Sequence, residues 1–290
     1  MKFIFLILIF SVTVTQANDV ILRGESLFRA ASCALCHGTG TDRLSGGAGL
    51  TTAEGIFYPP NITPDKETGI GSWSNTDFLM AFRHGLAPVD GIAKKGEPYY
   101  PAFPYTSYTK MSDSDILAIK AYIFAKVKPV NKPNRKHKLK WMYRFRKLLY
   151  PWRKLFFKPG PMEPELGFER GSYIVQAVSH CTECHTPRYP LVKGLKVGLS
   201  FSGNADTPEG LAPNITCHAE TGIGKWTVED LVIYLEDGTR PFGGSAKGVM
   251  EKIIDSNTSY LSEADRWAIA EYLFSEPCLK RTDLNNEKGK

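Results

Sequence analysis

Apolar positions recur at steps of three and four residues in two well-separated stretches of the chain. Each stretch begins after a serine, Ser112 or Ser262, that has an aspartate three positions later. The apolar positions are Ile116, Ile119, Tyr122 and Ile123 in the first stretch, and Trp267, Ile269, Tyr272 and Leu273 in the second. This spacing is typical of a helix with one buried face, and the serine hydroxyl can accept a hydrogen bond at the helix start. The sequence therefore predicts a helix after each serine.

Four further helices are predicted from local signals. Ser74 and Thr227 each precede an aspartate by three positions, which is a capping box with Asp in place of Glu or Gln. The helices that start there are expected to end at Gly85 and Gly238, since glycine suits the left-handed position after a helix. Two other helix candidates, which lead into pairs of cysteines, cover residues 24–32 and 169–179. No alternating run is long enough to indicate a sheet, so the predicted fold class is all-α.

The two halves of the chain repeat each other in their loops as well as in their helices. Residues 60–63 and 213–216 both read Pro-Asn-Ile-Thr, and residues 67–71 and 220–224 both read Glu-Thr-Gly-Ile-Gly. Such self-similarity indicates a tandem duplication. The predicted segments are a signal peptide at 1–17, a first domain at 18–127, an interdomain linker at 128–165, a second domain at 166–280 and a polar tail at 281–290.

The net charge of +6 is unevenly distributed along the chain. Residues 126–158 contain thirteen Lys or Arg residues and no Asp or Glu, so the two predicted domains together are acidic. Within residues 136–158 the cations are mixed with aromatic side chains, which favours contact with an anionic membrane surface. A linker whose aromatic residues pack on both domains, and docking onto an acidic partner, are the alternatives. Nucleic acid is not an expected partner of an exported protein.

Export is indicated by the N-terminus, which has the features of a secretory signal. Lys2 supplies a basic start, residues 3–10 are apolar, and Ala17 offers a small residue for cleavage before Asn18. The apolar run is too short to span a bilayer stably, with an uncleaved anchor as the alternative. The sequence therefore predicts a periplasmic protein, either free or held peripherally on the inner membrane.

The pattern Cys-x-x-Cys-His occurs twice, and it is the attachment signature for a covalently bound c-type haem. Its positions are Cys33, Cys36 and His37 in the first half, and Cys181, Cys184 and His185 in the second. Two cysteines one helical turn apart can bond both vinyl groups of one porphyrin, and the following histidine can ligate the iron. A zinc site made of four cysteines is less favoured, because both pairs carry the histidine and lie far apart. The sequence therefore predicts two covalently bound haem c groups.

Two cysteines, Cys217 and Cys278, lie outside these motifs. An even pair in an oxidising compartment favours a disulfide between them. Two separate buried thiols are the alternative.

An electron-transfer haem commonly takes a methionine as its second axial ligand. Met250 lies in a glycine-containing segment before the last helix, where class I cytochromes c place this ligand, and it is predicted to ligate the second iron. For the first iron the sequence favours Met111, although its repeat counterpart Leu261 holds the hydrophobic-staple position before the helix cap. A His84 ligand and an open iron position are the alternatives for the first haem.

Several segments carry a family resemblance, and they cover both predicted domains. They are residues 60–85, 100–105 and 110–113 in the first half, and residues 213–226, 248–250 and 260–262 in the second. These segments resemble the cytochrome c subunits of membrane-bound alcohol, gluconate and sorbitol dehydrogenases. The resemblance implies two tandem class I cytochrome c domains, here joined by a basic aromatic linker. The chain departs from the family in having two haem motifs rather than three, and Phe103 where the family often has methionine.

The resemblance also implies an electron donor and an acceptor. Subunits of this family take electrons from a flavin- or quinone-cofactor dehydrogenase on the periplasmic face and pass them to ubiquinone or onward to an oxidase. The sequence contains no nucleotide-binding or nucleophile motif, so we expect a dihaem electron carrier or dehydrogenase subunit without catalytic residues. A dihaem peroxidase-like enzyme with an open first haem is the alternative.

Overall fold

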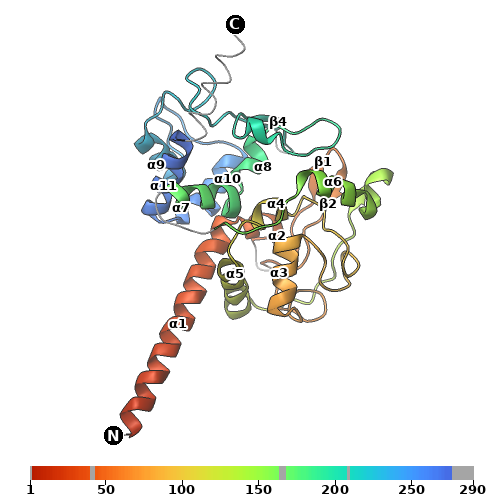
Figure 1. Ribbon diagram of the computed structural model, residues 1–290, viewed down its shortest axis with the longest axis vertical. Coiled ribbons are helices and arrows are strands. Elements are labelled where there is room, and N and C mark those ends of the chain that lie inside the picture. The colour runs from red at the N-terminus through yellow and green to blue at the C-terminus, as the bar shows by residue number, and fades with distance from the viewer. Residues whose placement is uncertain (1, 40–42, 163–167, 208–209, 276–290) are drawn as a thin grey trace.

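The computed structural model describes residues 2–39, 43–162, 168–207 and 210–275 (Figure 1). The helices of the first half are α1 (Lys2–Ala30), α2 (Cys33–His37), α3 (Asn75–His84), α4 (Tyr105–Tyr108) and α5 (Asp113–Lys126). Those of the second half are α7 (Phe168–Tyr173), α8 (Cys181–His185), α9 (Val228–Asp237), α10 (Val249–Ser256) and α11 (Glu263–Phe274). The linker contains α6 (Leu149–Phe156) and two 3-10 turns, Trp141–Arg144 and Arg146–Leu148. Two more 3-10 turns lie in the second half, at Val197–Leu199 and Thr258–Tyr260.

Helix α1 runs without a break from the predicted signal segment into the first half, and it projects away from the rest of the molecule (Figure 1). Within the described ranges, no helix combines the length and the apolar character needed to cross a membrane. Cleavage before Asn18 and the domain boundaries stay predictions.

The predicted caps start and end the helices where the sequence indicates. The Ser74 and Thr227 side chains each accept a hydrogen bond from the N–H of the aspartate three residues later, and that aspartate bonds back. The serines before α5 and α11 accept the corresponding N–H bonds. Gly85 and Gly238 take the left-handed conformation after α3 and α9, with φ of 56° and 81°.

The prediction of an all-α fold is wrong, because the structure also contains two small antiparallel sheets. One has the order β1 (Leu50–Thr52), β2 (Gly55–Phe57) and β3 (Lys138–Leu139), and the other pairs β4 (Asn204–Thr207) with β5 (Gly210–Ala212). In the first sheet Leu50 pairs with Phe57, and Gly55 pairs with Leu139 of the linker. Strands of two to four residues are too short to produce a visible alternation of apolar and polar residues.

Each half is built on a close crossing of its first and last helices, α1 with α5 and α7 with α11. Gly24 and Gly171 lie at these crossings. A Cβ atom at Gly24 would lie 2.0 Å from the carbonyl oxygen of Ala118, and one at Gly171 would lie 1.9 Å from that of Ala268. The helix backbones can approach this closely because neither glycine has a side chain.

The second half has one more residue than the first between this glycine and its cysteine motif. The structure accommodates it as a π-helical turn over Ile174–Val178, closed by a 2.8 Å bond from the N–H of Ser179 to the carbonyl of Ile174. A π turn spans one residue more per hydrogen bond than an α turn. Both motifs therefore follow helices that cross the last helix at an equivalent glycine.

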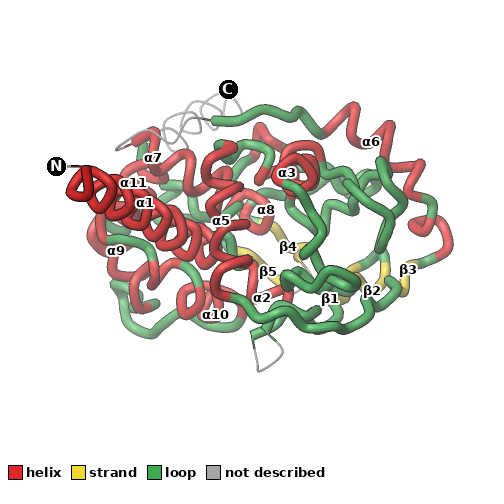
Figure 2. Tube along the Cα trace, turned by 90° about the horizontal axis from the view of Figure 1, so that it is seen from below, coloured by secondary structure: helices red, strands yellow, loops and turns green. Residues whose placement is uncertain are grey.

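The two halves lie against each other rather than being joined by the linker alone. The first half's α4 contacts the π turn of the second half, and α1 contacts the 3-10 turn Thr258–Tyr260. The Asn257 side chain donates hydrogen bonds to the Ala30 carbonyl at 2.6 Å and to the Ser32 hydroxyl at 2.8 Å. Figure 2 shows α1, α7 and α11 together at one end of the molecule, with the strands β1 to β3 and α6 toward the other.

Candidate functional site

Both Cys-x-x-Cys-His motifs face one continuous cavity of about 1840 Å³, lined by the two halves and the linker. The motif residues on its wall are Cys33, Cys36, His37, Cys181, Cys184 and His185. Sites for a single small molecule or cofactor usually measure roughly 300–1,000 Å³. The cavity therefore has room for more than one large group, and its mostly apolar wall suits the porphyrin that the motifs indicate.

The short helices α2 and α8 present the motif cysteines on the cavity wall. Each begins after a residue in the left-handed conformation, Ser32 with φ of 53° and His180 with φ of 42°. This turn ends the preceding helix and redirects the chain. Burial raises the pKa of Cys33 and of Cys181 to about 12, which reflects the apolar surroundings of these sulfur atoms.

The two motif histidines are oriented by the same contact. His37 Nδ1 lies 2.7 Å from the carbonyl oxygen of Pro60, and His185 Nδ1 lies 2.7 Å from that of Pro213. Because a carbonyl oxygen only accepts hydrogen bonds, Nδ1 carries the hydrogen and Nε2 keeps the lone pair that an iron ligand needs. Burial lowers the pKa of both imidazoles, which favours the neutral, ligating form.

The repeated Pro-Asn-Ile-Thr segments hold these carbonyl groups in place. Asn61 Oδ1 accepts hydrogen bonds from the backbone N–H of Thr63 at 2.9 Å and from its hydroxyl at 2.7 Å. Asn214 makes the same two bonds with Thr216, at 2.8 and 2.7 Å. Each asparagine thus fixes a turn directly after the proline. In both halves the Pro-Asn-Ile-Thr segment thus holds the carbonyl that contacts the motif histidine.

Met250 is the second residue of α10, and its side chain lies on the cavity wall, partly buried against the core. The structure therefore brings Met250 into the same cavity as the second motif. Its thioether is a chemically suitable ligand for haem iron. Ligation itself remains a prediction.

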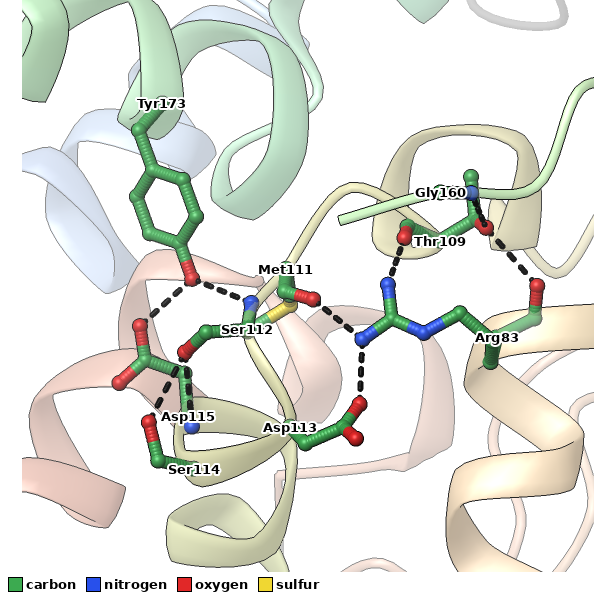
Figure 3. A network of polar contacts seen from close by, with 9 residues as sticks. All are labelled: Arg83, Thr109, Met111, Ser112, Asp113, Ser114, Asp115, Gly160 and Tyr173. Atoms are coloured by element: carbon green, nitrogen blue, oxygen red, sulfur yellow. Dashed lines mark hydrogen bonds and ion pairs between the residues drawn. The ribbon is translucent and has the colours of Figure 1, made fainter. Parts of the chain in front are cut away.

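Met111, by contrast, is fully buried and is not part of the cavity wall. Figure 3 shows it within a polar network that joins the two halves. Its carbonyl oxygen accepts a hydrogen bond from Arg83 at 2.7 Å. The Tyr173 hydroxyl accepts a hydrogen bond from the N–H of Ser112 at 3.0 Å and donates to the Asp115 carboxylate at 2.6 Å. The Met111 side chain therefore lies off the cavity wall that carries the first motif.

The cysteines fall into two groups. The four motif cysteines form no disulfides, so their sulfur atoms can bond a porphyrin. Cys217 is disulfide-bonded, whereas Cys278 lies outside the described residues, and the pairing of the two remains a prediction.

Two arginines of the linker stack on tyrosine rings of the first half. The guanidinium of Arg135 lies 4.1 Å from the ring centre of Tyr58, and that of Arg146 lies 4.2 Å from the ring centre of Tyr100. Arg146 also donates hydrogen bonds to two carbonyl oxygens of segment 92–98, both at 2.9 Å. The exposed linker lysines are Lys128, Lys132, Lys136, Lys138, Lys140, Lys147, Lys154 and Lys158. Arg135 and Arg146 attach the linker to the first half, and Lys132 adds a 3.3 Å hydrogen bond to the Ser45 hydroxyl.

Glu183, inside the second motif, links the two halves beside the cavity. Its carboxylate accepts hydrogen bonds from the hydroxyl groups of Thr106 at 2.7 Å and Ser107 at 3.1 Å, and it pairs with Arg188 at 2.5 Å. Burial opposes its charge, but Arg188 and the hydroxyl bonds lower the pKa of Glu183 below its usual value. Sequence reasoning missed this residue, because the two middle positions of the motif carry no signal of their own.

Comparisons with known proteins identify the family of the chain. A family model described as cytochrome c matches residues 21–125. The gluconate 2-dehydrogenase cytochrome c subunit of Pantoea cypripedii is 37% identical over 280 residues, and the match covers 90% of this chain and 60% of that protein. The fructose dehydrogenase cytochrome subunit of Gluconobacter japonicus is 37% identical over 264 residues, covering 89% of this chain and 52% of that protein.

A shorter relative is matched over most of its length. The diheme cytochrome c-type protein of Cereibacter sphaeroides is 38% identical over 271 residues, and the match covers 89% of this chain and 86% of that protein. The chain therefore spans little more than half of the two dehydrogenase subunits but nearly all of this relative.

Proposed function

Since the chain belongs to the family of dihaem c-type cytochromes, which transfer electrons through covalently bound haem c, we propose that it carries electrons from a membrane-associated dehydrogenase to the respiratory chain in the periplasm. The observation that carries the proposal is the continuous cavity lined by both motifs. Two haems that share one cavity allow electrons to pass between them inside the chain.

The proposal assigns a role to each motif residue. The cysteines of each motif form the thioether bonds to one haem. His37 and His185, held by their proline carbonyls, would each ligate one iron. Met250 would be a further ligand of the second iron. The haems would supply the redox chemistry, and the protein would fix their orientation.

The relatives support a dehydrogenase as the electron donor. Two of them are named as cytochrome subunits of gluconate 2-dehydrogenase and fructose dehydrogenase, and one from Gluconobacter oxydans as the cytochrome c subunit of alcohol dehydrogenase (quinone). We propose a flavin- or quinone-cofactor dehydrogenase as the donor for this chain, and a membrane quinone or an oxidase as the acceptor. The substrate reaction takes place on the dehydrogenase.

The linker supports peripheral attachment to the inner membrane. Two large aromatic side chains, Trp141 and Tyr150, are exposed among its lysines and do not line the cavity. Trp141 exposes 73% of its surface. Aromatic side chains mixed with lysines suit the headgroup region of an anionic membrane. This contact would hold the carrier near a membrane-bound donor and acceptor.

The electron-carrier proposal is tested by a redox titration of the purified protein that carries its haems, combined with a haem count. We expect two haems per chain, and two reversible one-electron steps in the haem absorption. The same preparation is mixed with hydrogen peroxide and a reduced artificial donor. A haem that cannot be reversibly reduced would contradict the proposal, and rapid peroxide turnover would favour a peroxidase instead.

The membrane contact is tested by flotation with vesicles of phosphatidylglycerol and phosphatidylcholine. The wild-type protein is expected to float with these vesicles, and the triple variant Lys140→Glu, Lys147→Glu, Lys154→Glu is expected to stay in the dense fraction. The matched control carries Lys225→Glu, Lys247→Glu and Lys252→Glu, three exposed lysines of the second half. Equal flotation of both variants, or none for the wild type, would contradict the contact.

A further inference from the structure

We infer that the two haem pockets differ. Met250 ligates the second iron, whereas the first iron keeps an open coordination position that binds a small diatomic ligand. This inference rests on the proposed attachment of one haem at each motif. It adds a ligand-binding site to a chain otherwise described as an electron carrier.

The internal repeat places the candidate ligands in equivalent connections before the last helix of each half. In the second half, residues 239–261 include Met250, which lies on the cavity wall. In the first half, residues 86–111 include Met111, the one methionine of that segment. Met111 is 0% exposed and lies off the cavity wall, inside the network between the halves. The repeat therefore supplies a thioether to the cavity in its second copy and not in its first.

Phe103 forms the cavity wall within this first connection. Its ring packs against those of Phe82, Tyr99 and Tyr108, with centroid distances of 5.4, 5.9 and 5.6 Å. Packing on three rings holds the phenyl group in place. A phenyl ring offers no lone pair to iron, so Phe103 cannot be a ligand.

Two histidines outside the motifs also line the cavity, and both are engaged elsewhere. His137 Nδ1 accepts a hydrogen bond from the N–H of Tyr58 at 3.1 Å, so the ring hydrogen sits on Nε2 and no second lone pair remains. The His180 ring bonds to the backbone of Ala31 and lies 5.5 Å from the ring of Tyr108. His137 is therefore not available to the first iron, and His180 directly precedes Cys181 of the second motif rather than belonging to the first half's connection.

Among the described residues, the methionines on the cavity wall are Met142 and Met250. Met142 belongs to the linker turn Trp141–Arg144, and 46% of its surface is exposed. Met142 lies outside residues 86–111, so it does not occupy the position in the repeat that Met250 has in the second half. His84, at the end of α3, is exposed and does not line the cavity.

The wall beside Phe103 indicates the class of ligand. Tyr99 and Tyr100 line the cavity next to it. Burial raises the pKa of both phenols, so their hydroxyl groups stay protonated and uncharged. The polarity and steric access of the distal pocket decide what a haem binds. A wall of closely packed aromatic rings suits a small diatomic molecule better than a bulky substrate.

The test is a carbon monoxide titration of the reduced, full-length protein with its haems, read by absorption and compared with the haem count. The wild type is expected to bind one carbon monoxide per two haems. Met250→Leu opens the second iron, so this variant is expected to bind two per chain. Met111→Leu and Met142→Leu are the matched controls, and they are expected to behave as the wild type.

Phe103→Met tests the position of the site, since it offers a thioether with little change in side-chain volume. If the new thioether occupies the first iron nine-tenths of the time, the apparent Kd for carbon monoxide rises about tenfold. The oxidised variant is also expected to gain far-red sulfur-to-iron absorption. An unchanged Kd with full haem content would contradict the assignment of this pocket.

Other outcomes separate this inference from the proposed function. A wild type with two haems and reversible reduction that binds no carbon monoxide would overturn the inference and leave the electron carrier standing. If Met111→Leu or Met142→Leu then gained carbon monoxide binding, that methionine would be the missing ligand. A protein without covalent haem would defeat both proposals.

Discussion

Replacing Gly24 with alanine is expected to destabilise the first half of the molecule, because α1 crosses α5 with no space for a side chain. The added Cβ would lie 2.0 Å from the carbonyl oxygen of Ala118 and 3.0 Å from the Cβ of Tyr122. Real Cβ atoms essentially never come within 3.0 Å of another heavy atom, so the two helices must separate by about 1 Å. The nearest atom belongs to a helix backbone, which cannot rotate away as a side chain could.

The expected loss follows from two opposing effects. Overpacking a close contact costs about 1–3 kcal/mol, whereas alanine in place of glycine inside a helix contributes about 1 kcal/mol of stability. Because the clash is with backbone, we place its cost at the upper end, which leaves a net loss of about 2 kcal/mol. For a chain of this size, that lowers the unfolding temperature by about 4–8 °C.

The assay is thermal unfolding of the haem-loaded protein, followed by helical circular dichroism. Gly91→Ala is the matched control, since a Cβ there would meet nothing within 4 Å. Gly171→Ala, at the equivalent crossing in the second half, should give a loss similar to that of Gly24→Ala. If Gly24→Ala unfolds at the same temperature as Gly91→Ala, the close helix crossing is not a structural requirement of the fold.

Three further changes test the surroundings of the site. Asn61→Ala leaves two Thr63 donors without their acceptor and should cost about 1–3 kcal/mol in urea unfolding; no loss would mean that the turn holds without this side chain. Tyr173→Phe removes the hydroxyl that donates to the buried Asp115 carboxylate and should lower the free energy of unfolding by about 1.5–3 kcal/mol. A urea midpoint equal to that of the wild type would contradict this expectation. Burial, with a nearby arginine, lowers the pKa of His137 from 6.5 to about 4. The neutral form of His137 is therefore favoured in the folded state. Its contribution to the free energy of unfolding is fully present above pH 6.5 and is lost as the pH falls toward 4. Wild-type stability should decline over this range more steeply than that of His137→Gln, and parallel slopes would count against the reasoning.

The helices were predictable where one residue determines the local geometry. The hydroxyl of Ser74 or Thr227 satisfies the helix start, and Gly85 or Gly238 adopts the left-handed conformation after the end. The short strands were not predictable, because β3 pairs with β2 only once the linker has folded back over the first half. That return depends on contacts between segments far apart in the sequence, which no local pattern records.

The candidate site shows the same limit. The motif cysteines and histidines follow from a five-residue pattern, and the structure brings both copies to one cavity. Met111 and Met250 both precede the last helix of their half, yet packing places only Met250 on the cavity wall. The linker cations were equivalent in a charge count, although the structure places Arg135 and Arg146 over tyrosine rings of the first half. Such differences arise from tertiary contacts rather than from residue type.

The most direct test of the account is the intact mass of the purified chain, produced in a host that attaches haem. The wild-type mass is expected to equal that of the chain plus two haem groups. The double variant Cys33→Ala, Cys36→Ala is expected to carry one haem, and so is the double variant Cys181→Ala, Cys184→Ala. A wild-type chain carrying one haem or none would contradict the assignment of both motifs to a shared cavity for two haems.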